Sequence, residues 1–228
     1  MVERLRTSFS DRRLAVLGAL VGLSGLVAGL VAFRIAYSHS FEDVPYLWNL
    51  FLAWIPFGLA LLLYDRHRRG ARLFELVALG LLWLLFFPNA PYIVTDIKYL
   101  GDMTGKTFWF EGLLIGTAAC TGLLLGFISL YLIQAIVRRI AGAPYAWLFV
   151  FVSLGLSSIG VYLGRVLRWN SWDVFVRPGS LLGELAGALV DPLGHPRPIA
   201  ITVLFTSFLL ASYAIFYSLA RTSSLLSE

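Results

Sequence analysis

The sequence predicts an all-α protein, a polytopic bundle of about six transmembrane helices, and three observations predict this fold class. Hydrophobic residues make up 59% of the 228 residues and the mean hydropathy is +0.80, which is more apolar surface than a soluble protein of this size could bury. Charged residues are 14% of the chain, against about 25% in ordinary soluble domains. The apolar runs are continuous and do not alternate, which argues against a membrane β-barrel.

Six apolar segments are long enough to cross a hydrocarbon core of roughly 30 Å as helices. They are Leu14–Phe33, Tyr46–Tyr64, Leu73–Val94, Phe108–Ile133, Tyr145–Gly164 and Ile199–Leu219. The first is longer than the core of a signal peptide, so we expect a retained helix. Residues 180–190 form a shorter apolar stretch, for which an interfacial and a re-entrant helix both remain open. We expect a single integral membrane domain over residues 1–228.

The distribution of basic residues predicts the orientation of the helices. Eleven of the 18 Lys and Arg residues lie in the N-terminal segment, the second and fourth connections and the C-terminal tail. Because cytoplasmic loops carry an excess of Lys and Arg, we expect a bacterial inner membrane protein with both termini on the cytoplasmic side. The net charge of +5 is then a topology signal, and nothing in the sequence indicates a nucleic-acid partner.

The third predicted span contains a helix break at Pro88-Asn89-Ala90-Pro91. The apolar run before it, Leu73–Phe87, is too short to cross a bilayer alone, so we expect the break inside the membrane near the outer face. Irregular backbone at such depth is tolerated where it is buried in protein or lines a polar cavity. The break therefore marks a candidate site, to which Asn89 and the following Asp96 would contribute.

A second polar segment follows the fifth predicted span. If that helix continues, Arg165, Arg168, Trp169 and Trp172 fall within one stripe, with Asp173 at its margin. Two guanidinium groups three residues apart suit phosphate or carboxylate, and they oppose the positive-inside bias. In the expected topology this stripe and the helix break reach the same outer face.

These residues define a candidate site with assigned roles. Asn89, Arg165, Arg168, Trp169 and Trp172 are the expected substrate-binding residues, and Asp96 and Asp173 are the candidate acid and base. Glu111, at the start of the fourth span, is a further candidate. No metal-ligand spacing, phosphate loop or hydrolase motif occurs, so no metal or cofactor is expected. Structural ion pairs and interfacial anchoring are the competing interpretation.

These two segments resemble a known family. Residues 87–96 (FPNAPYIVTD) and the stretch from Tyr162 to Asp173 are similar to the bacterial integral membrane family catalogued as domain of unknown function 1361. A less specific stretch, residues 122–131, adds to the resemblance, which covers roughly residues 45–220. The resemblance implies a multi-pass membrane protein and implies no activity or catalytic residue.

Three functions remain open from the sequence. The first is engagement of a membrane lipid, through an anionic headgroup or a lipid-linked phosphate, with or without a chemical reaction. The second is a small-solute or ion permease, because broken helices beside polar residues occur in transporters. The third is a non-catalytic assembly partner that would use the small-residue stripes of the first, fourth and fifth spans as its contact surface. The same stripes would suit a homodimer, but packing within the bundle is the favoured explanation of them.

Overall fold

The structure is a computed structural model that describes residues 2–39, 41–102, 108–166, 176, 179 and 196–225. In this part of the chain the regular structure is entirely helical. Six helices are long and apolar enough to cross a membrane. The all-α, polytopic helix bundle that the sequence predicts is therefore confirmed.

The helices follow the predicted spans closely, with one difference. In chain order they are α1 (Val2–Ser38), α2 (Val44–Arg68), α3 (Leu73–Phe86), α4 (Asn89–Tyr92), the 3₁₀ helix η1 (Ile93–Asp102), α5 (Phe108–Ala141), α6 (Ala143–Val166) and α9 (Pro196–Leu225). The third candidate span runs from Leu73 through the break to Gly101, beyond the Val94 that the apolar run predicts. The break therefore lies farther inside the span than expected. The predicted short helix at residues 180–190 lies outside the described residues.

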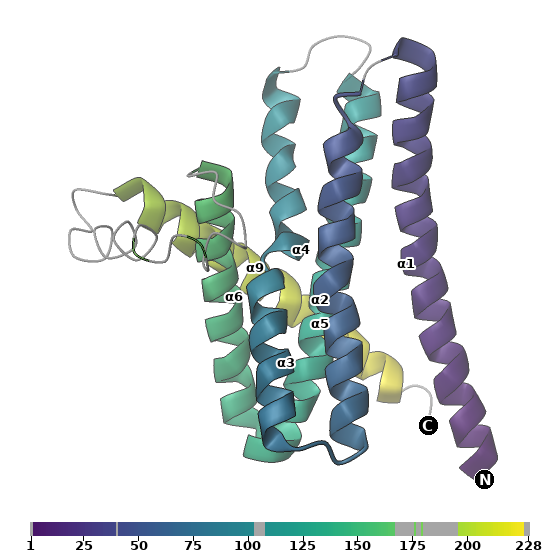
Figure 1. Ribbon diagram of the computed structural model, residues 1–228, viewed down its shortest axis with the longest axis vertical. Coiled ribbons are helices and arrows are strands. Elements are labelled where there is room, and N and C mark those ends of the chain that lie inside the picture. Colours follow the sequence, from purple (N-terminus) through teal and green to yellow (C-terminus); the bar gives the residue numbers. More distant parts are fainter. Residues whose placement is uncertain are drawn as a thin grey trace.

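α5 is the central helix of the bundle. It packs against α1, α2, α4, η1, α6 and α9, and its apolar segment is the most buried of the six candidate spans. Figure 1 shows α1, α2, α5 and the α3–η1 column running side by side, while α9 crosses the bundle obliquely and packs on α6. Two buried hydrogen bonds stabilise this packing: Trp83 Nε1 donates to Ser129 Oγ at 3.2 Å, and Tyr213 Oη donates to Gln134 Oε1 at 2.6 Å.

The helices differ in length, which sets the level of the candidate site. α6 has 24 residues and is about 36 Å long, whereas α5 has 34 residues and is about 51 Å long. We call the end of the bundle that holds the α1–α2 connection the upper end, as drawn in Figure 1. There α5 and η1 extend past the end of α6 (Figure 1). A bilayer matched to α6 would therefore leave the upper ends of α5 and η1 outside its core.

The break between α3 and α4 is packed tightly by glycines of the neighbouring helices. A Cβ atom on Gly122 of α5 would lie 2.6 Å from the Ala90 carbonyl oxygen, and one on Gly160 of α6 would lie 2.9 Å from Pro88 Cγ. Gly126 faces Ala90 in the same way. These glycines therefore serve packing within the bundle. By contrast, no neighbouring atom lies within 4 Å of the Cβ positions of four glycines in α1: Gly18, Gly22, Gly25 and Gly29.

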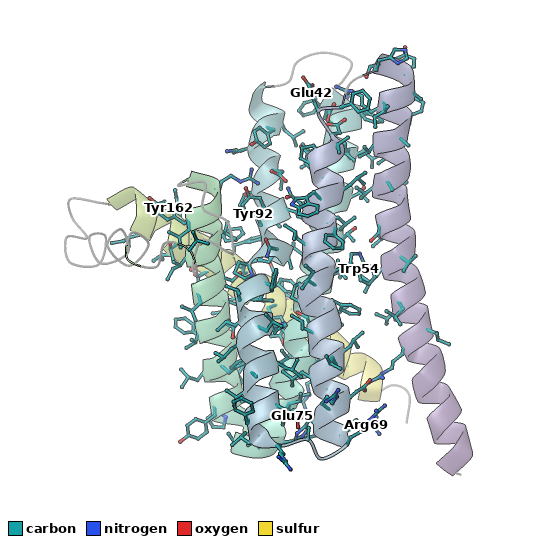
Figure 2. The ribbon with its side chains drawn as sticks, in the orientation of Figure 1. Glu42, Trp54, Arg69, Glu75, Tyr92 and Tyr162 are labelled. Carbon is teal, nitrogen blue, oxygen red and sulfur yellow. The ribbon has the colours of Figure 1, made fainter. Side chains whose placement is uncertain are left out.

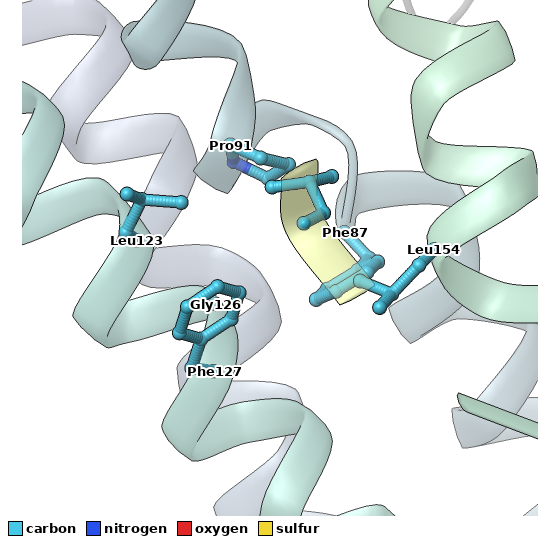
Figure 3. Close-up of a pocket in the computed structure, with 7 residues that line it drawn as sticks. Phe87, Pro91, Leu123, Gly126, Phe127 and Leu154 are labelled. Carbon is cyan, nitrogen blue, oxygen red and sulfur yellow. The ribbon is translucent and has the colours of Figure 1, made fainter. Parts of the chain in front are cut away.

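A narrow apolar gap adjoins the break on the side of α5, α6 and α9. Figure 3 shows Phe87 and Pro91 of the break close to Leu123 and Phe127 of α5 and to Leu154 of α6. The gap is too narrow to admit a water molecule, and its lining is almost entirely apolar. It is a packing gap beside the proline break, and it offers no polar group to an anionic ligand.

Candidate functional site

The structure brings two of the predicted site residues, Asp96 of η1 and Arg165 of α6, into direct contact. The two segments that carry them are separated by 69 positions in the sequence, so the contact joins α6 to the third span. Four other predicted residues lie outside the described part of the chain: Arg168, Trp169, Trp172 and Asp173. The remaining one, Asn89, lies at the helix break.

Arg165 is held by hydrogen bonds from all three of its guanidinium nitrogens. Nη2 pairs with Asp96 Oδ1, and Nε donates to Thr95 Oγ1 at 2.7 Å. Nη1 donates to Tyr99 Oη over a longer distance, 3.3 Å. The guanidinium also lies over the ring of Tyr92, 4.2 Å from its centroid, where a cation–π attraction adds to the ion pair.

The two sides of this guanidinium have different surroundings. On the inner side the Asp96 side chain is only 4% exposed, and Asn49 of α2 lies close to the same carboxylate. A carboxylate this deeply buried needs its cation, because burying an unpaired charge is strongly unfavourable. On the outer side Tyr99 is exposed, and so is Lys98 next to it. The inner contacts fix Arg165, while Nη1 faces the exposed side.

Among the described residues of this site, positive charge exceeds negative charge. Arg165 and Lys98 carry one positive charge each, and Asp96 carries one negative charge, which leaves a surplus of one positive charge. Lys98 lies near enough to interact electrostatically with Asp96, and its ammonium is 4.9 Å from the centre of the Tyr99 ring. The Arg165 guanidinium also lies near this ring, 5.7 Å from its centre, and guanidinium and ammonium groups both bind phosphate.

The Asn89 side chain hydrogen-bonds to the backbone at the helix break. Its side-chain nitrogen donates to the Phe86 carbonyl oxygen at 2.9 Å, at the end of α3. In an α-helix the Phe86 carbonyl would accept from the Ala90 N–H. That N–H instead donates to the Phe87 carbonyl at 3.1 Å, whose usual helical donor is missing because Pro91 has no N–H group. The Asn89 amide replaces the Ala90 N–H as a donor to Phe86, so the side chain that the sequence predicts to bind substrate here stabilises the break.

Glu111 belongs to a second charged cluster and not to the Arg165 site. Glu111 pairs with Nη1 of Arg34 in α1. Nε of the same arginine lies 3.9 Å from Oδ2 of Asp43, the residue before α2. We call Arg34, Asp43 and Glu111 the Arg34 cluster. Sequence reasoning missed Arg34 and Asp43 as site residues. The sequence did contain a signal for this pair. Arg34 directly follows the first predicted span, Glu111 lies near the start of the fourth, and both are at the predicted outer face.

The two charged groups lie at different levels of the bundle. Figure 2 shows Tyr92 and Tyr162, which mark the Arg165 level on α4 and α6, well below Glu42 at the upper end. Tyr46 of α2 lies between them, since it interacts electrostatically with Asp96 and Tyr99 on one side and with Asp43 and Glu111 on the other. The Arg165 site is thus set at the end of α6, and the Arg34 cluster lies beyond it.

The described residues contain no group of three or more His, Cys, Asp or Glu side chains that could hold a metal ion. What the site offers is the guanidinium of Arg165 in contact with the exposed Tyr99. This guanidinium can donate hydrogen bonds to an oxyanion, and two tyrosine rings flank it.

Comparison with known proteins places the chain in a family. The model of a family described as "Protein of unknown function (DUF1361)" matches residues 48–212, and this range contains the helix break, η1 and Arg165. No curated protein and no solved structure matches the chain. Since the match covers well over half of the sequence, the chain belongs to the DUF1361 family of proteins of unknown function.

Proposed function

We propose that the protein binds the phosphate of an anionic lipid headgroup, or of a lipid-linked phosphate, on the exposed side of Arg165. The observation that carries this proposal is the asymmetry of the guanidinium. Nε and Nη2 donate hydrogen bonds to Thr95 and Asp96, whereas the contact of Nη1 within the described part of the chain is a 3.3 Å hydrogen bond to the exposed Tyr99. A phosphate oxygen can replace the tyrosine hydroxyl without breaking the buried ion pair.

The level of the site supports a lipid ligand. α6 is about 36 Å long, close to the roughly 30 Å of a hydrocarbon core, and Arg165 lies in its last turn. A side chain at that position reaches the headgroup region when α6 spans the bilayer. We also propose that the membrane is a bacterial inner membrane, with both termini in the cytoplasm and the Arg165 site at the outer face. The excess of Lys and Arg at the opposite end supports this orientation.

The proposed site includes the predicted residues that follow α6. Arg168 would add a second guanidinium, and Trp169 and Trp172 would anchor the segment at the headgroup level. If the protein catalyses a reaction on the lipid, Asp173 is the remaining candidate for the general base. Asp96 is paired with Arg165, so we assign it the role of holding that guanidinium in place.

Lipid retention by the purified protein tests this proposal. The double variant Asp96→Asn/Arg165→Gln removes the guanidinium and leaves no unpaired buried carboxylate. We expect it to retain several-fold less phosphatidylglycerol by native mass spectrometry than the wild type, and Lys98→Ala to show a smaller loss. Parallel loading with a polyprenyl phosphate separates the two sources of phosphate.

A matched control removes an ion pair at the opposite end of the bundle. Arg66 Nη1 and Glu75 Oε2 are 3.4 Å apart and both side chains are well exposed, so Arg66→Gln/Glu75→Gln removes one charge of each sign without touching the site. Its lipid retention should equal that of the wild type. If both double variants retain as much of either lipid as the wild type, the proposal is wrong.

The permease and the assembly partner stay predictions from the sequence. Solute flux in proteoliposomes under a proton or sodium gradient tests the first. For the second, Gly122 is unsuitable as a probe because it packs against Ala90 within the chain. Gly22 of α1 has no neighbour within 4 Å of its Cβ position, so Gly22→Leu would disturb a partner helix or a second copy and spare the fold.

A further inference from the structure

The Arg34 cluster has two buried carboxyl groups and one cation. Arg34 comes from α1, Asp43 from the residue before α2, and Glu111 from the first turn of α5. The side chains of Asp43 and Glu111 are 7% and 2% exposed. Figure 2 places the neighbouring Glu42, a third carboxylate, at the same upper end. The charges of the cluster therefore do not balance when both buried carboxyls are ionised.

The contacts with Arg34 are unequal. Glu111 Oε1 is in direct contact with Arg34 Nη1, whereas the closest approach of Asp43 to the same guanidinium is 3.9 Å, too long for a hydrogen bond. Glu111 is thus the partner of Arg34. Asp43 is the buried carboxyl with the weaker partner, and it also fails to cap α2 through its side chain.

Several buried polar atoms of the cluster make no hydrogen bond. They are Arg34 Nε, Asp43 Oδ2 and Glu111 Oε2. Ionised carboxylates only accept hydrogen bonds, so two of them side by side cannot satisfy each other. Arg34 Nε is a donor, but it lies 3.9 Å from Asp43 Oδ2 and makes no hydrogen bond. A carboxylic acid carries an O–H donor, so one proton on this pair would provide a donor for one of the two unpaired carboxylate oxygens. The unpaired atoms therefore point to a bound proton.

Electrostatics favours the same conclusion for Asp43. Burial raises the pKa of its carboxyl, the Arg34 guanidinium lowers it, and the charge of Glu42 raises it further. The facing charged or titratable groups are Arg34 from α1, Glu111 from α5 and Tyr46 from α2, and Tyr46 in turn interacts with Asp96 and Tyr99 of η1. Arg34 is the only cation among these groups that pairs with the cluster in the described residues.

We propose that Asp43 and Glu111 form a proton-binding site that holds one proton, on Asp43, at pH values where a free aspartate is ionised, with Arg34 and Glu111 as the ionised pair. The site joins the upper end of α1 to α2 and α5. In the protonated state the cluster is neutral and α1 is held by the ion pair. Loss of the proton leaves two buried carboxylates against one guanidinium, which weakens the attachment of α1.

The direction of the pH dependence follows from the raised pKa. The folded protein binds a proton on Asp43 at pH values where the unfolded chain has released it, so this contribution to stability is complete below the ordinary aspartate pKa. It is lost as the pH rises from there through the higher pKa of the folded state. Asp43→Asn mimics the protonated form and should abolish this part of the pH dependence.

Infrared spectroscopy of the purified full chain in nanodiscs detects the proton directly. We expect the carbonyl band of a protonated carboxyl in the wild type above the ordinary aspartate pKa, its disappearance as the pH is raised further, and its absence from Asp43→Asn. Glu42→Gln should keep the band but lose it at a lower pH, since one neighbouring negative charge is gone. The band should persist in Asp96→Asn/Arg165→Gln, which reports on the other ion pair.

The absence of the band from the wild type at every pH above the ordinary aspartate pKa would overturn the proposal, as would its persistence in Asp43→Asn. If Asp43→Asn does not fold, the Glu42→Gln variant tests the proposal by itself. The assignment to Asp43 is then overturned if the carbonyl band of Glu42→Gln disappears at the same pH as that of the wild type. The outcome is separate from that of the lipid-retention experiment, because the two ion pairs share no residue.

Discussion

Arg165 owes its position to a few short contacts from the third span. Asp96 supplies the counter-charge, Thr95 accepts from Nε, and the Tyr92 ring lies against the guanidinium. Thr95 is itself oriented, because its hydroxyl donates to the Tyr92 carbonyl oxygen at 2.7 Å. The sequence indicated Asp96 and Arg165 as polar residues at one predicted level, and it left open whether Asp96 neutralises an arginine or acts as an acid or base.

The reason is that pairing depends on side-chain direction. Periodicity places Arg165 on a helix face, but the 3₁₀ geometry of η1 after two prolines decides which way Thr95, Asp96 and Tyr99 point. Lys98 and Tyr99 lie within three residues of Asp96 and belong to the exposed side of the site. Apolar periodicity carries no information on such a segment, so these residues were missed.

Removal of the Thr95 hydroxyl should weaken the hold on Arg165. We expect Thr95→Val to lower the free energy of unfolding by about 0.5–1.5 kcal/mol, because the Nε donor loses its acceptor in a partly buried place. Thr117→Val is the matched control, since the Thr117 hydroxyl donates only to Leu113 in its own helix. Denaturant unfolding in detergent micelles measures both. Equal stability of Thr95→Val and the control would show that this hydrogen bond does not hold Arg165.

The broken third span is the element that positions the site. α3 ends at Phe86, just before the Pro88 that the sequence marks as a break. Composition and proline placement were sufficient to predict the break and the six long helices. They were not sufficient to predict that η1 continues to Asp102, because residues 97–102 include Lys98, Gly101 and Asp102 and carry no continuous apolar run.

The glycines opposite the break fix its place between α5 and α6. A methyl group on Gly122 would lie 2.6 Å from the Ala90 carbonyl oxygen, and backbone cannot move aside as a flexible side chain can. We therefore expect Gly122→Ala to destabilise the protein by about 1–3 kcal/mol through overpacking. Thermal unfolding followed by circular dichroism measures this loss.

Gly116→Ala is the control for that substitution, because it lies two turns away on the same helix and has no atom within 4 Å of its Cβ position. It should unfold like the wild type or slightly later. A Gly122→Ala protein as stable as Gly116→Ala would show that α5 does not press against the break.

The whole bundle is joined by charged contacts at both ends. Arg13 and Asp65, 3.3 Å apart, join α1 to α2 at the lower end, and the Arg34 cluster joins α1 to α2 and α5 at the upper end. The Arg165–Asp96 pair joins α6 to η1 between them. The Arg165–Asp96 and Arg34–Glu111 pairs are largely buried, where a charge is unfavourable unless paired, so these contacts favour one arrangement of the helices.

The pairing of Arg165 with Asp96 is the claim on which the proposed site depends, and a double-mutant cycle tests it most directly. The free energy of unfolding is measured for the wild type, Asp96→Asn, Arg165→Gln and the double variant in the same detergent. We expect each single variant to be clearly less stable and the double variant to recover part of the loss, with a coupling energy of about 1–3 kcal/mol. Strictly additive effects, with a coupling energy near zero, would show that the two side chains do not interact and would contradict the site.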